Sequence, residues 1–144
     1  MRILPYDNNL RLHLISIWEQ SVRATHQFLS AEDFDFYQQI VAQIDFGQFQ
    51  IFFCAEDSIP LGFIGMDNRK IEMLFLLPES IGKGYGKFLL NFALTELYAT
   101  EVDVNEQNEN AVTFYEHFGF VTYDRSELDP SGKPYPILHM RLGS

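Results

Sequence analysis

The chain holds a single cysteine and no long apolar run. Because Cys54 is the only cysteine among 144 residues, no internal disulfide can form and a cysteine-based zinc site is not expected. No apolar stretch approaches the ~20 residues of a membrane span, and the opening MRILPYDNNL lacks the apolar segment of a secretory signal. We therefore expect a cytoplasmic protein with no membrane partner and no metal, in which Cys54 is a buried strand residue.

Positive charge is also scarce. Ten Lys and Arg stand against twenty Asp and Glu, which gives a net charge of −10. Because a nucleic-acid partner requires clustered cations that neutralise phosphates, this balance argues against nucleic-acid binding. It is compatible with a cationic small substrate, although acidity also serves solubility alone. Apolar residues are abundant at 47 %, and at this length they indicate one well-packed domain over residues 1–144.

The spacing of the apolar residues predicts a mixed α+β protein with the element order β-α-α-β-β-β-α-β-α-β-β. A first helix is expected over residues 10–22, and a second from Ser30, which with Asp33 forms an N-terminal cap. Two more helices are expected at 88–97 and 109–118. The expected strands cover residues 2–4, 50–55, 61–66, 71–77, 101–105, 120–125 and 135–142. This order excludes a doubly wound α/β fold.

The segment at 71–93, IEMLFLLPESIGKGYGKFLLNFA, indicates a phosphate-binding loop. An apolar strand reaches a proline, and three alternating glycines, Gly82, Gly84 and Gly86, precede an amphipathic run. Glycines let backbone N–H groups approach a ligand closely, and the N-terminus of the following helix adds partial positive charge. Together these features predict a cradle for a phosphorylated cofactor.

Two common phosphate-binding patterns do not fit this loop. A Walker loop needs a Lys followed by Ser or Thr at the start of its helix, whereas here Lys87 is followed by Phe88. A dinucleotide-binding fold places its glycines after the first strand of a βαβ unit, whereas these glycines follow the fourth strand of a meander. The loop therefore belongs to a different cofactor class.

The combination resembles the GNAT superfamily of acetyl-CoA-dependent N-acetyltransferases. It comprises the strand, proline, glycine loop and helix, then a strand that ends near Asn105 and the run NENAVTFYEHFGF. The likeness covers residues 49–120, and the element order agrees along the chain; THQFLS, VNEQNENA and GKPYPIL are also similar to one bacterial subgroup. The resemblance implies a predominantly antiparallel sheet flanked by helices, acetyl-CoA as cofactor, coenzyme A as product, a primary amine as acceptor, and a monomer or homodimer.

The resemblance also implies which residues hold the coenzyme. Backbone N–H groups from Gly82 to Lys87 would bind the pyrophosphate, and the N–H of Leu76 would polarise the acetyl carbonyl. Ile81 stands where the family has Arg or Gln, which should weaken binding modestly. Lys83 and Lys87 either add charge beside the phosphates or are ordinary solvated side chains. The implied coenzyme contacts are Phe75, Leu76, Ile81, Gly82, Lys83, Gly84, Tyr85, Gly86, Lys87, Asn108 and Tyr115.

Three catalytic residues follow from the same resemblance. Tyr115 stands at the position of the family's general acid. A hydroxyl of pKa ~10 can protonate a leaving thiolate; the alternative is a packed aromatic. His26 is the first candidate for the general base, with capping of the interhelix turn as the alternative. Glu72 is the second candidate, with a solvated strand charge as the alternative. The expected acceptor contacts are Thr25, His26, Asn105 and His139.

The expected reaction is the direct attack of an amine on acetyl-CoA in a ternary complex, with Tyr115 as general acid. Two alternatives remain open at this point: a catalytically silent module that senses acetyl-CoA, and a nucleotide-binding regulatory domain. Turnover of an amine would distinguish the enzyme from the sensor module. Stabilisation by acetyl-CoA but not by ATP would exclude the nucleotide-binding domain. The sequence does not identify the acceptor, because this fold serves many amines.

Overall fold

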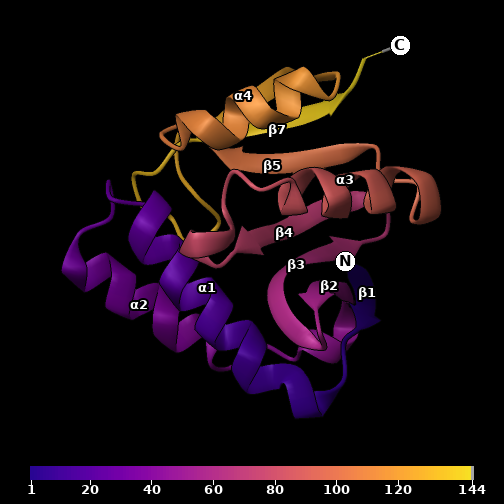
Figure 1. Ribbon diagram of the computed structural model, residues 1–144. Coiled ribbons are helices and arrows are strands. Elements are labelled where there is room, and N and C mark those ends of the chain that lie inside the picture. Colours follow the sequence, from indigo (N-terminus) through magenta and orange to yellow (C-terminus); the bar gives the residue numbers. More distant parts are fainter. Residues whose placement is uncertain (144) are drawn as a thin grey trace.

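The computed structural model describes residues 1–143, in which seven strands form one sheet and four α-helices pack against it (Figure 1). The strands are β1 (Arg2–Pro5), β2 (Gln50–Glu56), β3 (Ile59–Asp67), β4 (Lys70–Leu76), β5 (Glu101–Asn105), β6 (Phe120–Ser126) and β7 (Ile137–Leu142). The helices are α1 (Arg11–Thr25), α2 (Ala31–Val41), α3 (Tyr85–Glu96) and α4 (Glu109–His117). This confirms the expected element order.

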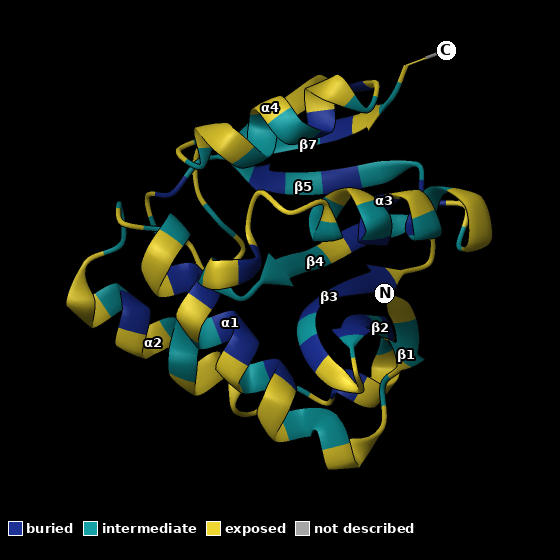
Figure 2. Ribbon diagram, in the orientation of Figure 1, coloured by how far each residue is buried: buried dark blue, intermediate teal, exposed yellow. Residues whose placement is uncertain are grey.

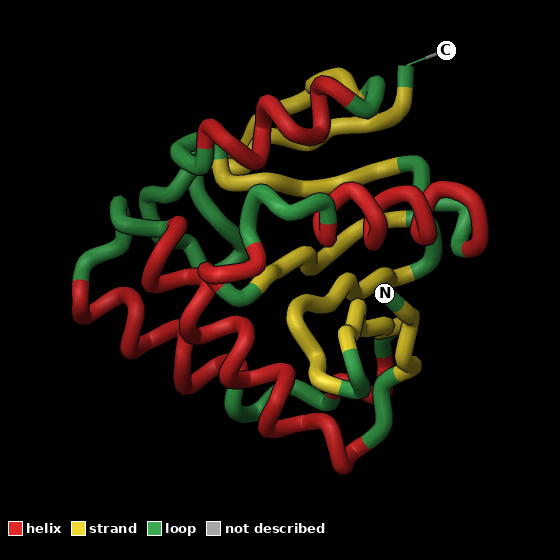
Figure 3. The backbone as a smooth tube through the Cα atoms, in the orientation of Figure 1, coloured by secondary structure: helices red, strands yellow, loops and turns green. Residues whose placement is uncertain are grey.

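The sheet is mixed and mostly antiparallel. Its strands lie in the order β1-β2-β3-β4-β5-β7-β6, and β4 and β5 form the one parallel pair in the described chain. These two strands pair only at Lys70 with Glu101 and at Ile71 with Val102. Beyond those residues they diverge toward their C-terminal ends, as Figure 3 shows. The predicted fold class is confirmed, and the sheet has a gap at its centre.

Helices cover both faces of the sheet. α3 and α4 pack on one face, and α1 packs on the other against β3 and β4 with α2 beside it (Figure 1). Buried segments on these helices face the sheet (Figure 2). Along β4, Leu74 and Leu76 pack into the core beneath α3 and α4, whereas Met73 and Phe75 pack into the core beneath α1. Because side chains alternate along a strand, β4 contributes to both cores and is held in place from both sides.

Two local predictions are confirmed. The Ser30 hydroxyl accepts a hydrogen bond from the Asp33 N–H at 3.1 Å and so caps α2. Cys54 lies inside β2 with no exposed surface, and burial raises the pKa of its thiol to about 11. At neutral pH the thiol is therefore protonated and shielded, which removes it as a nucleophile.

Among the element boundaries that differ from the sequence-based expectation, two bear on the site. α1 continues to Thr25 instead of ending at residue 22, which carries one more helical turn toward the gap. β7 begins at Ile137 instead of residue 135. Tyr135, expected inside that strand, instead donates its hydroxyl to the carboxylate of Asp33 in α2. A contact between segments 102 residues apart leaves no local pattern, so the shorter strand could not be predicted.

Gly62 provides a test of how tightly β3 and β4 are packed. It lies opposite Leu76, and a Cβ added to it would lie 2.8 Å from the carbonyl oxygen of Phe75. Gly62→Ala should therefore push the two strands apart and lower the free energy of unfolding by about 1–3 kcal/mol. Urea unfolding measures this change.

Gly143→Ala is the matched control. Its added Cβ would lie 3.5 Å from the Gly119 carbonyl oxygen, an ordinary contact, and the change should stay within about 0.5 kcal/mol. Equal unfolding midpoints for the two variants would contradict this description of the strand contact.

Candidate active site

The gap between β4 and β5 contains a cavity of about 520 Å³ that reaches both faces of the sheet. On one side it is bounded by the glycine loop and the start of α4, and on the other by the end of α1 and by polar side chains of the strands. Its lining residues are Ser21, Thr25, His26, Ile71, Glu72, Met73, Leu74, Phe75, Leu76, Ile81, Gly82, Gly84, Gly86, Lys87, Val102, Asp103, Val104, Asn105, Asn108, Asn110, Ala111, Phe114 and Tyr115.

Backbone groups of β4 face this gap. The N–H of Leu77 donates to the carbonyl of Leu61 in β3 at 2.8 Å. Because successive backbone groups of a strand point to opposite edges, the N–H of Leu76 points toward β5. β5 pairs with β4 only as far as Ile71, so the Leu76 N–H faces the cavity and not a neighbouring strand.

The glycine loop adds a set of donors and two cations. Gly82 and Gly84 have φ angles of +82° and +91°, which favour glycine, and the Phe88 N–H donates to the Gly84 carbonyl at 3.0 Å as α3 begins. The N–H groups of the first turn of α3 precede any helical acceptor. Lys83 and Lys87 form no ion pair within residues 1–143, although the chain carries twice as many acids as bases. These donors and charges suit a pyrophosphate.

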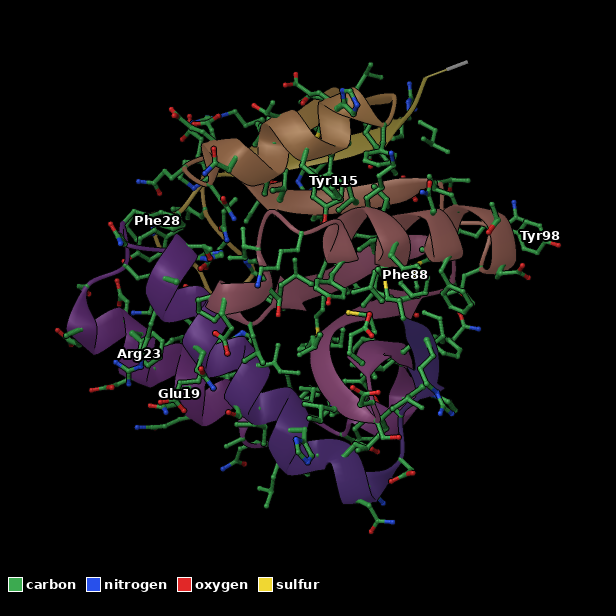
Figure 4. The ribbon with its side chains drawn as sticks, in the orientation of Figure 1. Glu19, Arg23, Phe28, Phe88, Tyr98 and Tyr115 are labelled. Carbon is green, nitrogen blue, oxygen red and sulfur yellow. The ribbon has the colours of Figure 1, made fainter. Side chains whose placement is uncertain are left out.

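Tyr115 reaches the cavity from α4. Figure 4 shows it between α4 and β5, and it is 5 % exposed. The rings of Phe114 and Phe120 hold it in place, with centroids at 5.3 and 5.7 Å. Burial raises the pKa of the phenol above its ordinary value, so the hydroxyl is a proton donor at neutral pH. Nearby, the Asn108 side chain accepts from the Ala111 N–H at 3.4 Å and begins the helix.

His26 reaches the cavity from the opposite side, at the C-terminal end of α1. The Thr25 hydroxyl donates its one proton to the Ser21 carbonyl at 2.8 Å, so it accepts at 2.8 Å from Nδ1 of His26. This pattern of hydrogen bonds assigns a ring proton to Nδ1. Burial between the rings of Phe28 and Phe75 lowers the pKa of His26 to about 4. The ring is consequently neutral at pH 7, which leaves Nε2 unprotonated, and the same burial disfavours the imidazolium form.

Two carboxylates also line this side of the cavity. Lys70 bridges them, with Nζ 3.4 Å from Glu72 and 2.6 Å from Asp103. The other Asp103 oxygen lies 2.7 Å from Nδ1 of His139, whose Nε2 lies 2.7 Å from the Ser126 hydroxyl. A chain of polar contacts thus runs from the cavity across β5 and β7 to β6.

A second cavity of about 250 Å³ adjoins the first one. The two share His26, Phe75 and Asn105, so they meet where α1 ends and β4 and β5 part. The walls of the second cavity are mostly apolar and aromatic. Its lining residues are Trp18, Val22, His26, Leu29, Tyr37, Ile40, Val41, Phe75, Asn105, Asp129, Pro130, Tyr135 and Ile137.

Comparison with known proteins identifies the family. The sequence profile of the acetyltransferase (GNAT) domain matches residues 14–141. The chain belongs to the GNAT acetyltransferase family. It is 38 % identical over 128 residues to the peptidyl-lysine N-acetyltransferase YjaB of Salmonella typhimurium, covering 88 % of each chain, and equally identical to YjaB of Escherichia coli, covering 88 % of this chain and 86 % of that protein. It is therefore an acetyl-CoA-dependent acetyltransferase.

The fold agrees with this assignment. The solution structure of apo-form YjaB from Escherichia coli superposes with a TM-score of 0.89 at 35 % identity, covering 97 % of this chain and 95 % of that one. In the described part of the chain no helix is long and apolar enough to cross a membrane. The same residues contain no group of three or more His, Cys, Asp or Glu side chains that could hold a metal ion.

Most of the sequence-predicted site residues of this GNAT domain line the first cavity. Those that line it are Thr25, His26, Glu72, Phe75, Leu76, Ile81, Gly82, Gly84, Gly86, Lys87, Asn105, Asn108 and Tyr115. Lys83, Tyr85 and His139 do not belong to its lining. The two ring nitrogens of His139 contact Asp103 and Ser126, so His139 touches a lining residue, Asp103, but not the cavity itself.

Sequence reasoning missed Asp103 and Asp129. Asp103 lies between the buried Val102 and Val104 in EVDVN. Because side chains alternate between the two faces of a strand, this pattern could have placed Asp103 on the same face as Asn105. Asp129 lies in a polar loop with no regular pattern. Its position in the second cavity depends on packing against α2, which no local signal predicts.

The low pKa of His26 makes stability depend on pH. An unfolded histidine titrates at ~6.5, so between about pH 6.5 and 4 the unfolded chain binds a proton that the native chain does not. His26 therefore lowers the free energy of unfolding as the pH falls through this window, by at most about 3 kcal/mol. Urea unfolding from pH 4 to 8 should show His26→Gln gaining stability relative to the wild type toward pH 4.

His13→Gln is the control, since His13 is exposed on the same helix. This variant also loses an imidazole, but at a position that is not buried. A His26→Gln profile that runs parallel to the wild type would show that His26 is not a buried neutral histidine.

Proposed function

We propose that the chain transfers the acetyl group of acetyl-CoA directly to the side-chain amine of a peptidyl lysine in a ternary complex. One observation carries the proposal: a single cavity runs through the sheet with a proton donor, Tyr115, on one side and a proton acceptor, His26, on the other. The peptidyl-lysine acceptor is suggested by the name of the YjaB relatives.

The coenzyme half of the site is formed by backbone more than by side chains. The loop from Gly82 to Lys87 would hold the pyrophosphate through N–H groups, with the two lysines of that loop adding charge. The parted strands β4 and β5 would hold the pantetheine arm, and the Leu76 N–H would donate to the thioester carbonyl as negative charge develops on it. Ile81, 47 % exposed at the mouth of the cavity, adds no polar contact.

Proton transfer would use the two sides of the cavity. The lysine amine reaches the thioester as a neutral nucleophile, so its ammonium form must first lose a proton, and Nε2 of His26 would accept it. Acetyl-CoA supplies the activated acyl group and a thiolate leaving group. Tyr115 would donate its hydroxyl proton to that sulfur, and the second proton that the attacking nitrogen loses as the amide forms would restore the Tyr115 hydroxyl. Glu72 is the second candidate for the base, but Lys70 at 3.4 Å already engages its carboxylate.

The acceptor would enter through the second cavity. The shared residues His26, Phe75 and Asn105 mark the place where an amine from this side meets the acetyl group. Apolar walls such as Trp18 and Val22 suit the four methylenes of a lysine stem. The acceptor and the coenzyme would thereby occupy different cavities, so both can be bound at the same time, as a ternary complex requires.

Tyr115→Phe tests this function, because it removes the acid and keeps the ring. It should lower kcat for acetylation of a lysine peptide by about 10²-fold or more, while acetyl-CoA still raises the melting temperature, by an amount that corresponds to ~2.7 kcal/mol at 100 times Kd. Tyr98→Phe, an exposed tyrosine 65 % accessible, is the control and should match the wild type.

Three other outcomes would contradict the proposal. Stabilisation by acetyl-CoA without turnover of any amine would favour a silent sensor module. Stabilisation by ATP and not by acetyl-CoA would favour a nucleotide-binding domain. Full activity in Tyr115→Phe would remove that residue from the acid role.

A further inference from the structure

We propose that Asp129 in the second cavity binds a second cationic group carried by the acceptor, beside the amine that is acetylated. This inference rests on the proposed function, because it assumes that the acceptor enters through the second cavity. It adds the chemical class of acceptor that the enzyme prefers: an amine with a further positive charge close by. The group that Asp129 binds is a cation, which belongs either to the acceptor lysine itself or to a neighbouring residue.

Asp129 is the one carboxylate among the described residues that line the second cavity, and no lysine or arginine lines it. Within residues 1–143 no cation forms an ion pair with Asp129. The nearby Asp33 does have a partner, since Nζ of Lys133 lies 2.9 Å from its carboxylate. Lys133 therefore neutralises Asp33, and the negative charge of Asp129 at this cavity has no counter-ion among the described residues.

The Asp129 carboxylate is fixed in place by neutral donors. One of its oxygens accepts from the Ser131 N–H at 2.9 Å and from the Lys133 N–H at 3.0 Å, and the other accepts from the Tyr37 hydroxyl. Such donors stabilise a carboxylate without cancelling its charge. Burial and the Asp129 carboxylate raise the pKa of Tyr37, so its hydroxyl remains a donor. The charge is thus held rigidly at the cavity wall, ready for a ligand.

The loop that carries Asp129 is itself held against α2. Tyr135 donates its hydroxyl to Asp33, and the ammonium of Lys133 lies 4.5 Å from the centre of the Phe36 ring. The same contacts place the rings of Tyr37 and Tyr135 at the cavity, 6.4 Å apart by their centroids. Aromatic walls attract cations through their faces and pack well against methylene stems. A carboxylate in such walls selects a cation on an apolar stem.

The experiment compares acceptors that differ by one positive charge at pH 7, where an α-amine of pKa ~7.7–8.0 is mostly protonated. Lysine amide is compared with Nα-acetyl-lysine amide, and an Nα-acetylated Lys-Arg amide with the matching Lys-Gln amide. The first pair tests a charge on the acceptor lysine itself, and the second tests a charge on a neighbouring residue. At least one pair should show about tenfold higher kcat/KM for the more cationic member.

Asp129→Asn removes the charge and keeps the oxygen that accepts from Ser131 and Lys133. The variant should lose the preference, because kcat/KM falls more for the more cationic member of the pair than for the less cationic one. Glu127→Gln makes the same charge change at an exposed position in the same segment and should keep the preference. No preference in either wild-type pair, or a preference that survives Asp129→Asn, would overturn the inference.

A binding readout separates this inference from the proposed function. Trp18 is the only tryptophan of the chain and lines the second cavity, so its fluorescence reports occupancy. Acceptor titrations in the presence of coenzyme A should show the same preference, lost in Asp129→Asn. Preferential binding without acetylation would contradict the proposed function alone, whereas acetylation without preferential binding would overturn the inference alone.

Discussion

The parting of β4 from β5 is the constraint on which the rest of the site depends. The two strands pair at two positions and then separate, so β4 presents backbone groups, the Leu76 N–H among them, to a cavity and not to a neighbour. Buried backbone groups are costly without partners, so such a gap suits a ligand that supplies them. Because β4 and β5 are parallel, α3 connects the C-terminal end of β4 to the start of β5. The N-terminus of α3 and the glycine loop before it therefore lie at the open end of the gap.

Packing on both faces keeps the gap open. β4 alternates between two cores, with Leu74 and Leu76 on one side and Met73 and Phe75 on the other. Phe63 in β3 is fully buried, and its ring packs against the Phe75 ring with centroids 5.7 Å apart. This contact links β4 to the core beneath α1. The proposed site therefore has two halves, which share the edges of the parted strands. The coenzyme side would be formed with α3 and α4, and the acceptor side with α1 and α2.

The sequence predicted well what depends on neighbouring residues. The Ser30 cap, the strand at 101–105 and the glycine loop before a helix all follow from short patterns. The family resemblance singled out Tyr115 and His26, which both line the first cavity. It failed where distant segments meet. Tyr135 leaves the last strand for α2, and the position of Asp129 at a cavity depends on a partner 92 residues away.

In the proposed mechanism, coenzyme and acceptor enter the gap from opposite faces and meet at His26. A crystal structure with a bisubstrate analogue, in which coenzyme A is joined through an acetyl linker to the side-chain nitrogen of a lysine peptide, tests it most directly. We expect the pyrophosphate on the loop from Gly82 to Lys87, the linker beside Leu76 and the lysine stem in the second cavity. A lysine that leaves through the open face beyond Glu72 and Asp103, with the second cavity empty, would contradict it.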